Sequence, residues 1–222
     1  RAKGRLHYSL SFAMDPEKPD SLVFVSVFKP EDFKILSFGT LNFGKLDSSF
    51  VYETFNRYDS LVSFLVGPEN PDYVPPGSIS THLVTAVLTS EDGSFMYHRG
   101  FNEESFRKAI ADNIKNWRFV RGGSTITMQL VKNVFLTRNK DIARKIQEVM
   151  IVWLLENYRL CSKERMLEIY FNVIEWGPCI YGIGQASEFY FNKNPSELNL
   201  PESIFLAGII PKPRYYHTYF QQ

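Results

Sequence analysis

The fold is decided at residues 67–77, GPENPDYVPPG, where the hydrophobic pattern of the chain changes. Four prolines and two glycines in these eleven residues cannot continue a strand or a helix, because proline lacks an amide hydrogen and fixes φ. We therefore expect a boundary here. It separates a β-rich N-terminal region of unknown role, residues 1–72, from a second domain, residues 73–222.

Before this boundary, short apolar runs alternate with turn-forming residues. The runs are rich in Val, Phe and Tyr, which is typical of strands. Pro, Gly, Asp and Asn separate them and predict turns. The expected strands are Leu6–Ala13, Leu22–Phe28, Phe33–Phe38, Phe50–Phe55 and Leu61–Val66.

Beyond the boundary, apolar residues recur at helical spacing, as in Phe106, Ile110 and Ile114. The segment Val149–Leu155 is apolar all round, so its helix is expected to be buried. The chain is thus predicted to be α+β, with a mainly α-helical domain after the β-rich region. The expected helices span 80–89, 104–116, 125–136, 141–158, 162–171 and 202–207, with Asp141 and Ser162 as N-caps and Pro201 opening the last.

The composition is that of a globular protein, with 44% hydrophobic and 22% charged residues in a chain of 222. It excludes disordered and low-complexity chains, and the net charge of +1 argues against a nucleic-acid partner. Cys161 and Cys179 are too few for a disulfide scaffold and are expected as free thiols, with pairing in an oxidising compartment as the alternative. No apolar run reaches the roughly 18–20 residues of a membrane span. Because the chain begins at Arg1, we expect a processed product or an excised fragment.

Basic residues gather in one segment. Between Arg99 and Lys145 there are eleven basic and four acidic residues, a net charge of +7, which leaves −6 for the rest of the chain. Such a segment near a glutamate-bearing cleft indicates an anionic substrate. A solvated helical face is the alternative.

Residues 91–100, EDGSFMYHRG, follow the end of a predicted helix. A carboxylate such as that of Glu91, beside aromatic residues, loses water there, which raises its pKa toward the range of a general base. The alternative is an ordinary surface pair of Glu91 and Asp92.

Residues 122–133, GGSTITMQLVKN, place a glycine pair before a helix whose first amides would seat a phosphate. Lys132 shares a helical face with Thr125 and Gln129. The spacing differs from that of a P-loop, and an ordinary capped helix with a polar side is the alternative.

Arg144 and Lys145 precede Glu148 by four and three residues, about one helical turn. A simple salt bridge worth about 0.2–0.5 kcal/mol would explain this pattern. Glu148, however, immediately precedes seven apolar residues, where a carboxylate is costly unless it is paired or functional.

In this order and spacing, the motifs resemble the peptidoglycan glycosyltransferases, which include the transglycosylase domains of penicillin-binding proteins and the monofunctional cell-wall polymerases. The matching segments are 91–100, 122–133, 144–148 and Lys163–Asn172. Met128 departs from the family, where many members carry Gln. The resemblance covers roughly residues 73–216 and implies a lysozyme-like fold. A fifth, arginine-bearing motif is absent, so we expect a domain that is incomplete at its C-terminal end.

The resemblance implies an inverting enzyme that polymerises lipid II and releases undecaprenyl pyrophosphate. It makes Glu91 the general base, and makes Glu148 the group that assists the leaving pyrophosphate, directly or through a divalent cation (Mg or Mn). Asp92 and His98 would support the cleft and Phe95 would line it. The remaining expected substrate-binding residues are Ser124, Thr125, Gln129, Lys132, Lys140 and Arg144.

The same resemblance implies lipid II, the growing glycan chain and a membrane surface as partners, with cell-wall synthesis proteins as further candidates. It implies the bacterial cell envelope, at the outer, periplasmic face of the cytoplasmic membrane, with any membrane anchor outside this chain. The stretch Phe101–Phe119 is amphipathic and is expected either to lie in the membrane interface or to face the core as an ordinary helix.

Two other functions stay open. A muramidase-like hydrolase would release muropeptides from finished cell wall and would not depend on Lys132. Hydrolysis needs two carboxylates but no cationic group, so the +7 segment favours transfer from a pyrophosphate donor. A non-catalytic module for lipid II or glycan would bind without turnover.

Overall fold

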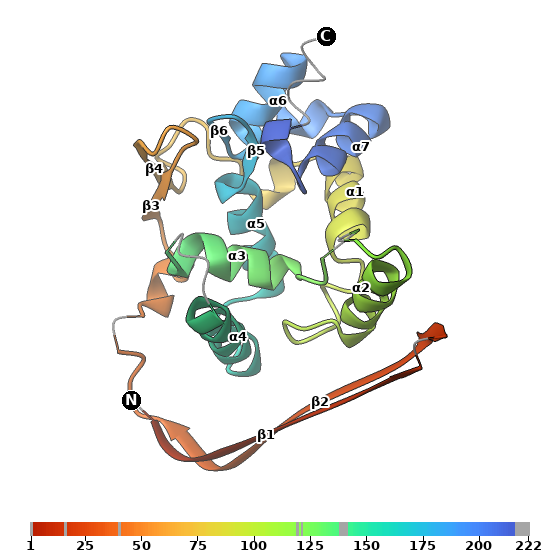
Figure 1. The fold of residues 1–222 in the computed structure, drawn as a ribbon. Helices are drawn as coiled ribbons and strands as arrows, with labels where there is room; N and C mark the ends of the chain where they lie inside the picture. The colour runs from red at the N-terminus through yellow and green to blue at the C-terminus, as the bar shows by residue number, and fades with distance from the viewer. Residues whose placement is uncertain are drawn as a thin grey trace. The chain divides into compact units, whose positions relative to one another are not determined.

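The computed structural model describes residues 2–15, 17–39, 41–118, 120, 122–137 and 142–215. The chain divides into two compact units, drawn in Figure 1. The first comprises Arg1–Asn42 and Phe101–Thr125, and the second comprises Phe43–Gly100 and Ile126–Gln222. The domain boundary expected at residues 72 and 73 stays a prediction. The α+β class, rich in helices, is confirmed.

The first unit is a long β-hairpin with one helix. Strands β1 (Ala2–Asp15) and β2 (Lys18–Ile35) pair antiparallel, and α2 (Glu103–Lys115) packs against β2. The separate strand expected at 33–38 is wrong, because β2 continues through its first residues. A register shift between Lys3 and Arg5 absorbs the irregularity, so that Ala2 still pairs with Ile35.

The second unit holds the remaining elements. In the view of Figure 1, the β3–β4 hairpin and the α1–α7 pair flank α5, and α3 runs across it. The strands are β3 (Phe50–Phe55), β4 (Leu61–Val66), β5 (Glu175–Gly177) and β6 (Ile180–Tyr181). The helices are α1 (Thr81–Glu91), α3 (Ile126–Phe135), α4 (Ile142–Asn157), α5 (Lys163–Val173), α6 (Ile183–Phe191) and α7 (Leu200–Ile209), with 3-10 turns at Phe43–Asp47, Pro76–Ser78 and Pro195–Glu197.

Helix α5 forms the centre of the core. Ile169, Tyr170 and Phe171 are all buried, and the ring of Trp176 stacks on Phe171 with centroids 6.1 Å apart. Helix α3 packs against both α4 and α5. The Ser162 hydroxyl accepts a hydrogen bond from the Arg165 amide, which confirms the predicted N-cap of α5.

Asn172 of α5 fastens the stretch that precedes α1. Its Oδ1 accepts a hydrogen bond from the Val74 amide at 2.9 Å, and its Nδ2 donates to the carbonyl oxygens of Val74 and Glu168, both at 2.9 Å. Because Asn172 is buried, the Val74 peptide has no ready access to water as a substitute partner.

We expect Asn172→Leu to lower the free energy of unfolding by about 2 kcal/mol, since the buried Val74 amide and carbonyl would lose their partners. Chemical denaturation followed by circular dichroism measures this. Asn157→Leu is the matched control, because its exposed amide only donates to the Trp153 carbonyl. Equal midpoints for the two variants would contradict the role of Asn172.

Three other expectations, on α4, on its N-cap and on the cysteines, have three different outcomes. Helix α4 is not buried all round: Ile146 and Met150 are 56% and 51% exposed, because α4 packs on one face only. Asp141, the expected N-cap of α4, lies outside the described residues. Cys161 and Cys179 are free, as expected. Among the described helices, none combines the length and apolar character needed to cross a membrane.

Candidate active site

Glu91 is the last residue of α1 and is partly buried. Gln129 on α3 donates a hydrogen bond from Nε2 to Glu91 Oε2 at 2.7 Å. Burial raises the pKa of Glu91 above its ordinary value, and the negative charge of Asp92 adds to this. The hydrogen bond from Gln129 and the charge of Lys132 oppose the rise. A carboxyl with a raised pKa is chemically suited to proton transfer near neutral pH.

Asp92 joins the loop after α1 to the start of α3. Its buried carboxylate accepts hydrogen bonds from His98 Nε2 at 2.8 Å and from the Ile126 amide at 3.1 Å. The Gly100 amide donates to His98 Nδ1 at 3.0 Å, so the ring proton lies on Nε2. The supporting roles expected for Asp92 and His98 stay a prediction.

Gly100 lets this loop approach α4 closely. Its φ is +84°, and a Cβ there would lie 2.5 Å from Val152 Cγ1 and 3.0 Å from Glu156 Cγ. A larger residue at position 100 would push the loop off α4 and disturb the amide that orients His98. The loop geometry around Asp92 therefore depends on this glycine.

Beneath the loop lies a buried ion pair. Lys163 Nζ donates to Glu156 Oε1 at 2.6 Å, and the Thr127 hydroxyl donates to the same oxygen at 2.6 Å. The Lys163 ammonium also lies 4.4 Å from the centroid of the Phe95 ring. Phe95 is only 1% exposed, so in this structure it supports the site from below instead of lining it.

A cluster of cationic residues lies where α3 faces α4. Glu148 is only 2% exposed and pairs with Lys145 and with Arg144, whose Nη1 lies 3.6 Å from Glu148 Oε2. The pKa of Lys132 is lowered, and the largest cause is burial of its ammonium away from water. Glu148 and Glu91 both act on Lys132 and oppose this shift, while Arg144 and Lys145 add to it. Lys132 thus interacts electrostatically with both glutamates that the sequence predicted.

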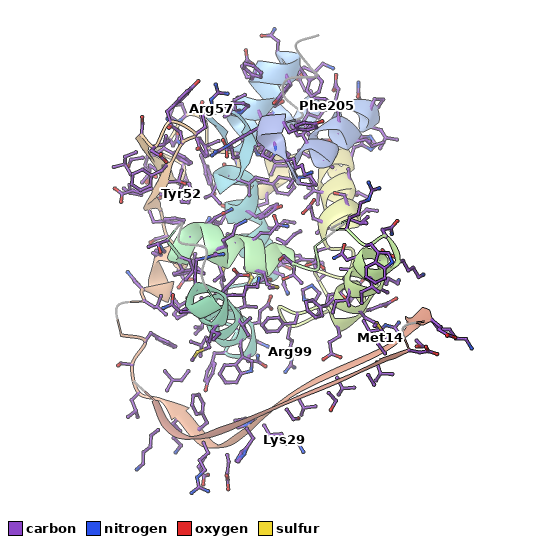
Figure 2. All side chains as sticks on the ribbon, viewed as in Figure 1. Met14, Lys29, Tyr52, Arg57, Arg99 and Phe205 are labelled. Carbon is purple, nitrogen blue, oxygen red and sulfur yellow. The ribbon has the colours of Figure 1, made fainter. Side chains whose placement is uncertain are left out.

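A groove of about 1000 Å³ adjoins this cluster. The β3–β4 hairpin forms one wall, on which Figure 2 labels Tyr52, and an Arg214–Glu175 ion pair of 2.9 Å lies on another. The sequence did not predict this wall, because the residue pattern of a strand does not show which groove the folded strand will border. Its lining residues include Lys132, Asn133, Arg144, Val173, Tyr181, Tyr52, Thr54, Phe55 and Leu61.

The remaining predicted residues lie elsewhere. Ser124 and Thr125 belong to the first unit, where Ser124 is exposed and Thr125 is buried. Lys140 lies outside the described residues. Within the part of the chain that is described, no three His, Cys, Asp or Glu side chains group as metal ligands, and Glu148 is already paired with two cations. The described side chains therefore do not form a resident metal site, and the divalent cation stays a prediction.

Comparison with known proteins gives one consistent result. The family model described as Transglycosylase matches residues 59–222. A "Biosynthetic peptidoglycan transglycosylase" of Dechloromonas aromatica is 46% identical over 144 residues, which are 65% of this chain and 62% of the relative. The proteins of that name from Methylobacillus flagellatus and Nitrosomonas eutropha are 43% identical over 154 residues (67% and 66%) and 46% identical over 143 residues (64% and 58%). The chain thus matches between 58% and 66% of the length of these relatives.

Proposed function

Because this chain belongs to the transglycosylase family, we propose that it is an inverting peptidoglycan glycosyltransferase that polymerises lipid II. The observation that carries the proposal is the position of Glu91. Its partly buried carboxyl has a raised pKa and interacts electrostatically with Lys132, which in turn interacts with Arg144 and Lys145. A base beside a cationic cluster suits attack on a sugar whose leaving group is a pyrophosphate.

In the proposed reaction, the 4-hydroxyl of lipid II attacks the anomeric carbon of the growing chain. Glu91 takes the hydroxyl proton, a new glycosidic bond forms with inversion, and the bond to the lipid pyrophosphate breaks. Gln129 holds Oε2 of Glu91, so we assign the other carboxylate oxygen to the substrate hydroxyl. Hydrogen-bond reach to that hydroxyl is the geometric requirement on a general base.

The leaving pyrophosphate gains negative charge as the bond breaks. Lys132, Arg144 and Lys145 would stabilise that charge more in the transition state than in the ground state, which is the condition for accelerating the step. Glu148 would hold Arg144 and Lys145 in place through its buried carboxylate. The groove beside them is large enough to take part of the donor glycan.

A lipid-linked substrate places the reaction at a membrane surface, so we propose the periplasmic side of the cell envelope as its location. Trp117, two residues beyond the end of α2, is 94% exposed, and Phe106 on α2 is also exposed. Aromatic side chains of this kind bind readily at a lipid interface. Cell-wall synthesis proteins are the expected protein partners.

We expect Lys132→Met to reduce polymerisation by about 10²–10³-fold, the cost typical of removing one group that stabilises developing charge. The assay follows labelled lipid II with the intact protein that contains this chain. Lys34→Met, which removes the same charge from an exposed position on β2, should match wild type. Equal rates for the two variants would contradict the role of Lys132 in stabilising the leaving pyrophosphate.

A further inference from the structure

A chain of two hydrogen bonds runs from the core to Glu91. Tyr170 on α5 donates from its hydroxyl to Gln129 Oε1 at 3.1 Å, and Gln129 Nε2 donates to Glu91 Oε2 at 2.7 Å. Tyr170 has no exposed surface. Three helices thus contribute one residue each to a single line of contacts that ends on the carboxylate.

Two partners set which way the Gln129 amide points, the Glu91 carboxylate at one end and the Tyr170 hydroxyl at the other. Burial, together with the nearby charges of Glu91 and Asp92, raises the pKa of Tyr170 well above its ordinary value, so its hydroxyl keeps its proton. With the amide turned over, Gln129 Oε1 would face the Glu91 carboxylate, and two acceptors would meet at hydrogen-bond distance. The hydroxyl proton of Tyr170 favours the orientation that directs the amide N–H at Glu91.

We propose that Tyr170 is a positioning residue, which locks the Gln129 amide in the orientation that donates a hydrogen bond to the ionised form of Glu91. This inference rests on the proposed function, because it concerns the protonation of the proposed base. Tyr170 itself touches neither substrate nor the reacting atoms.

The other groups around Glu91 explain why the orientation of the Gln129 amide matters for the ionisation of Glu91. Lys132 from α3 favours the charged form, Asp92 from the loop after α1 disfavours it, and burial disfavours it most. His98 is committed to Asp92 and does not neutralise Glu91. Losing the oriented amide would remove one of the two influences that keep Glu91 ionised.

The test is the pH dependence of lipid II polymerisation by Tyr170→Phe in the intact protein. We expect the acid limb of kcat/KM to move up by about 0.5–1 pH unit, the shift typical of one lost hydrogen bond to a charged group. At high pH, where Glu91 is ionised in any case, the rate should return to within about threefold of wild type, since Tyr170 touches no reacting atom.

Tyr190→Phe is the matched control. It removes the same atom from another buried tyrosine, whose hydroxyl donates to the Trp176 carbonyl at 3.0 Å. Its acid limb should coincide with that of wild type. Gln129→Met should shift the limb like Tyr170→Phe, and the double variant should shift it no further, because both changes break one chain of contacts. If Tyr170→Phe does not fold, Gln129→Met supplies the test.

Three outcomes would overturn the inference: an unmoved acid limb in Tyr170→Phe, an equal loss of rate at every pH, or the same shift in Tyr190→Phe. Each of these leaves the proposed function intact, provided that wild type polymerises lipid II and Glu91→Gln does not. If wild type forms no polymer, the proposed function itself fails, and the inference fails with it.

Discussion

Glu91→Gln is expected to reduce polymerisation of lipid II by about 10²–10⁴-fold, the usual effect of a general base, while leaving the melting temperature unchanged or higher. Gln still offers an oxygen to Gln129 Nε2, so the contact between α1 and α3 persists. What disappears is a carboxylate that burial disfavours. Activity and stability should therefore move independently.

The pH dependence of stability follows from the same cause. The pKa of Glu91 is raised in the folded state, so the folded protein binds this proton more tightly than the unfolded chain does. The stabilisation is present in full below the unfolded pKa and is lost as pH rises through the folded pKa. The stability gain of Glu91→Gln over wild type should thus be larger at neutral pH than in acid.

Parallel lipid II assays and thermal melts at two pH values check this prediction. Glu17→Gln, an exposed change in the β1–β2 turn, is the control that should alter neither quantity. A fully active Glu91→Gln would remove Glu91 from the role of base. A marked fall in its melting temperature would instead make Glu91 a stabilising residue of the fold.

Lys163→Met is expected to cost about 3–5 kcal/mol of folding free energy, because it leaves the buried carboxylate of Glu156 without its cation. Among the residues that the structure describes, the Thr127 hydroxyl alone would still donate to Glu156, and the contact between the ammonium and Phe95 would also be lost. Because this pair lies beneath the loop that carries Asp92 and His98, its loss should also reduce activity.

A double-mutant cycle isolates the interaction. Adding Glu156→Gln to Lys163→Met should recover much of the lost stability, since no charge then remains buried. Lys108→Met breaks the exposed pair with Glu104 on α2 and should cost less than about 1 kcal/mol. Equal costs for Lys163→Met and Lys108→Met, measured by denaturant unfolding, would contradict the importance of the buried pair.

Much of the helical domain could be predicted because its signals are local. Ser162 caps α5 through a contact three residues away, and the ends of α1 and α3 follow from apolar spacing within a few residues. Helix α6 escaped prediction. It begins between Gly182 and Gly184, and glycines of this kind weaken any helical pattern. Gly184 lies so close to the Asp72 carbonyl that a Cβ would approach it to 2.3 Å, a long-range contact that no local pattern encodes.

The burial of α4 shows another limit of sequence patterns. An apolar run predicts that a helix avoids water, but only its neighbours decide which faces are covered. Ile151 and Val152 are buried, while Met150, directly before them, is exposed. The uncovered apolar side chains are therefore a property of packing and could not be read from Val149–Leu155 alone.

The candidate site, too, could be predicted only in part from the sequence. The motifs identified Glu91, Gln129, Lys132 and Glu148, and the structure brings these residues into one connected set of contacts and charges. Tyr170 stood in a recognised motif without a role, because its partner Gln129 lies 41 positions away. A hydrogen bond between distant helices depends on the packed core, which sequence spacing does not specify.

The most direct measurement incubates the intact wild-type protein with labelled lipid II and follows glycan polymer and undecaprenyl pyrophosphate together. The proposed function predicts both products, with one pyrophosphate released for each glycosidic bond formed. Folded protein that yields neither product, or that instead releases muropeptides from finished peptidoglycan, would contradict the proposed function.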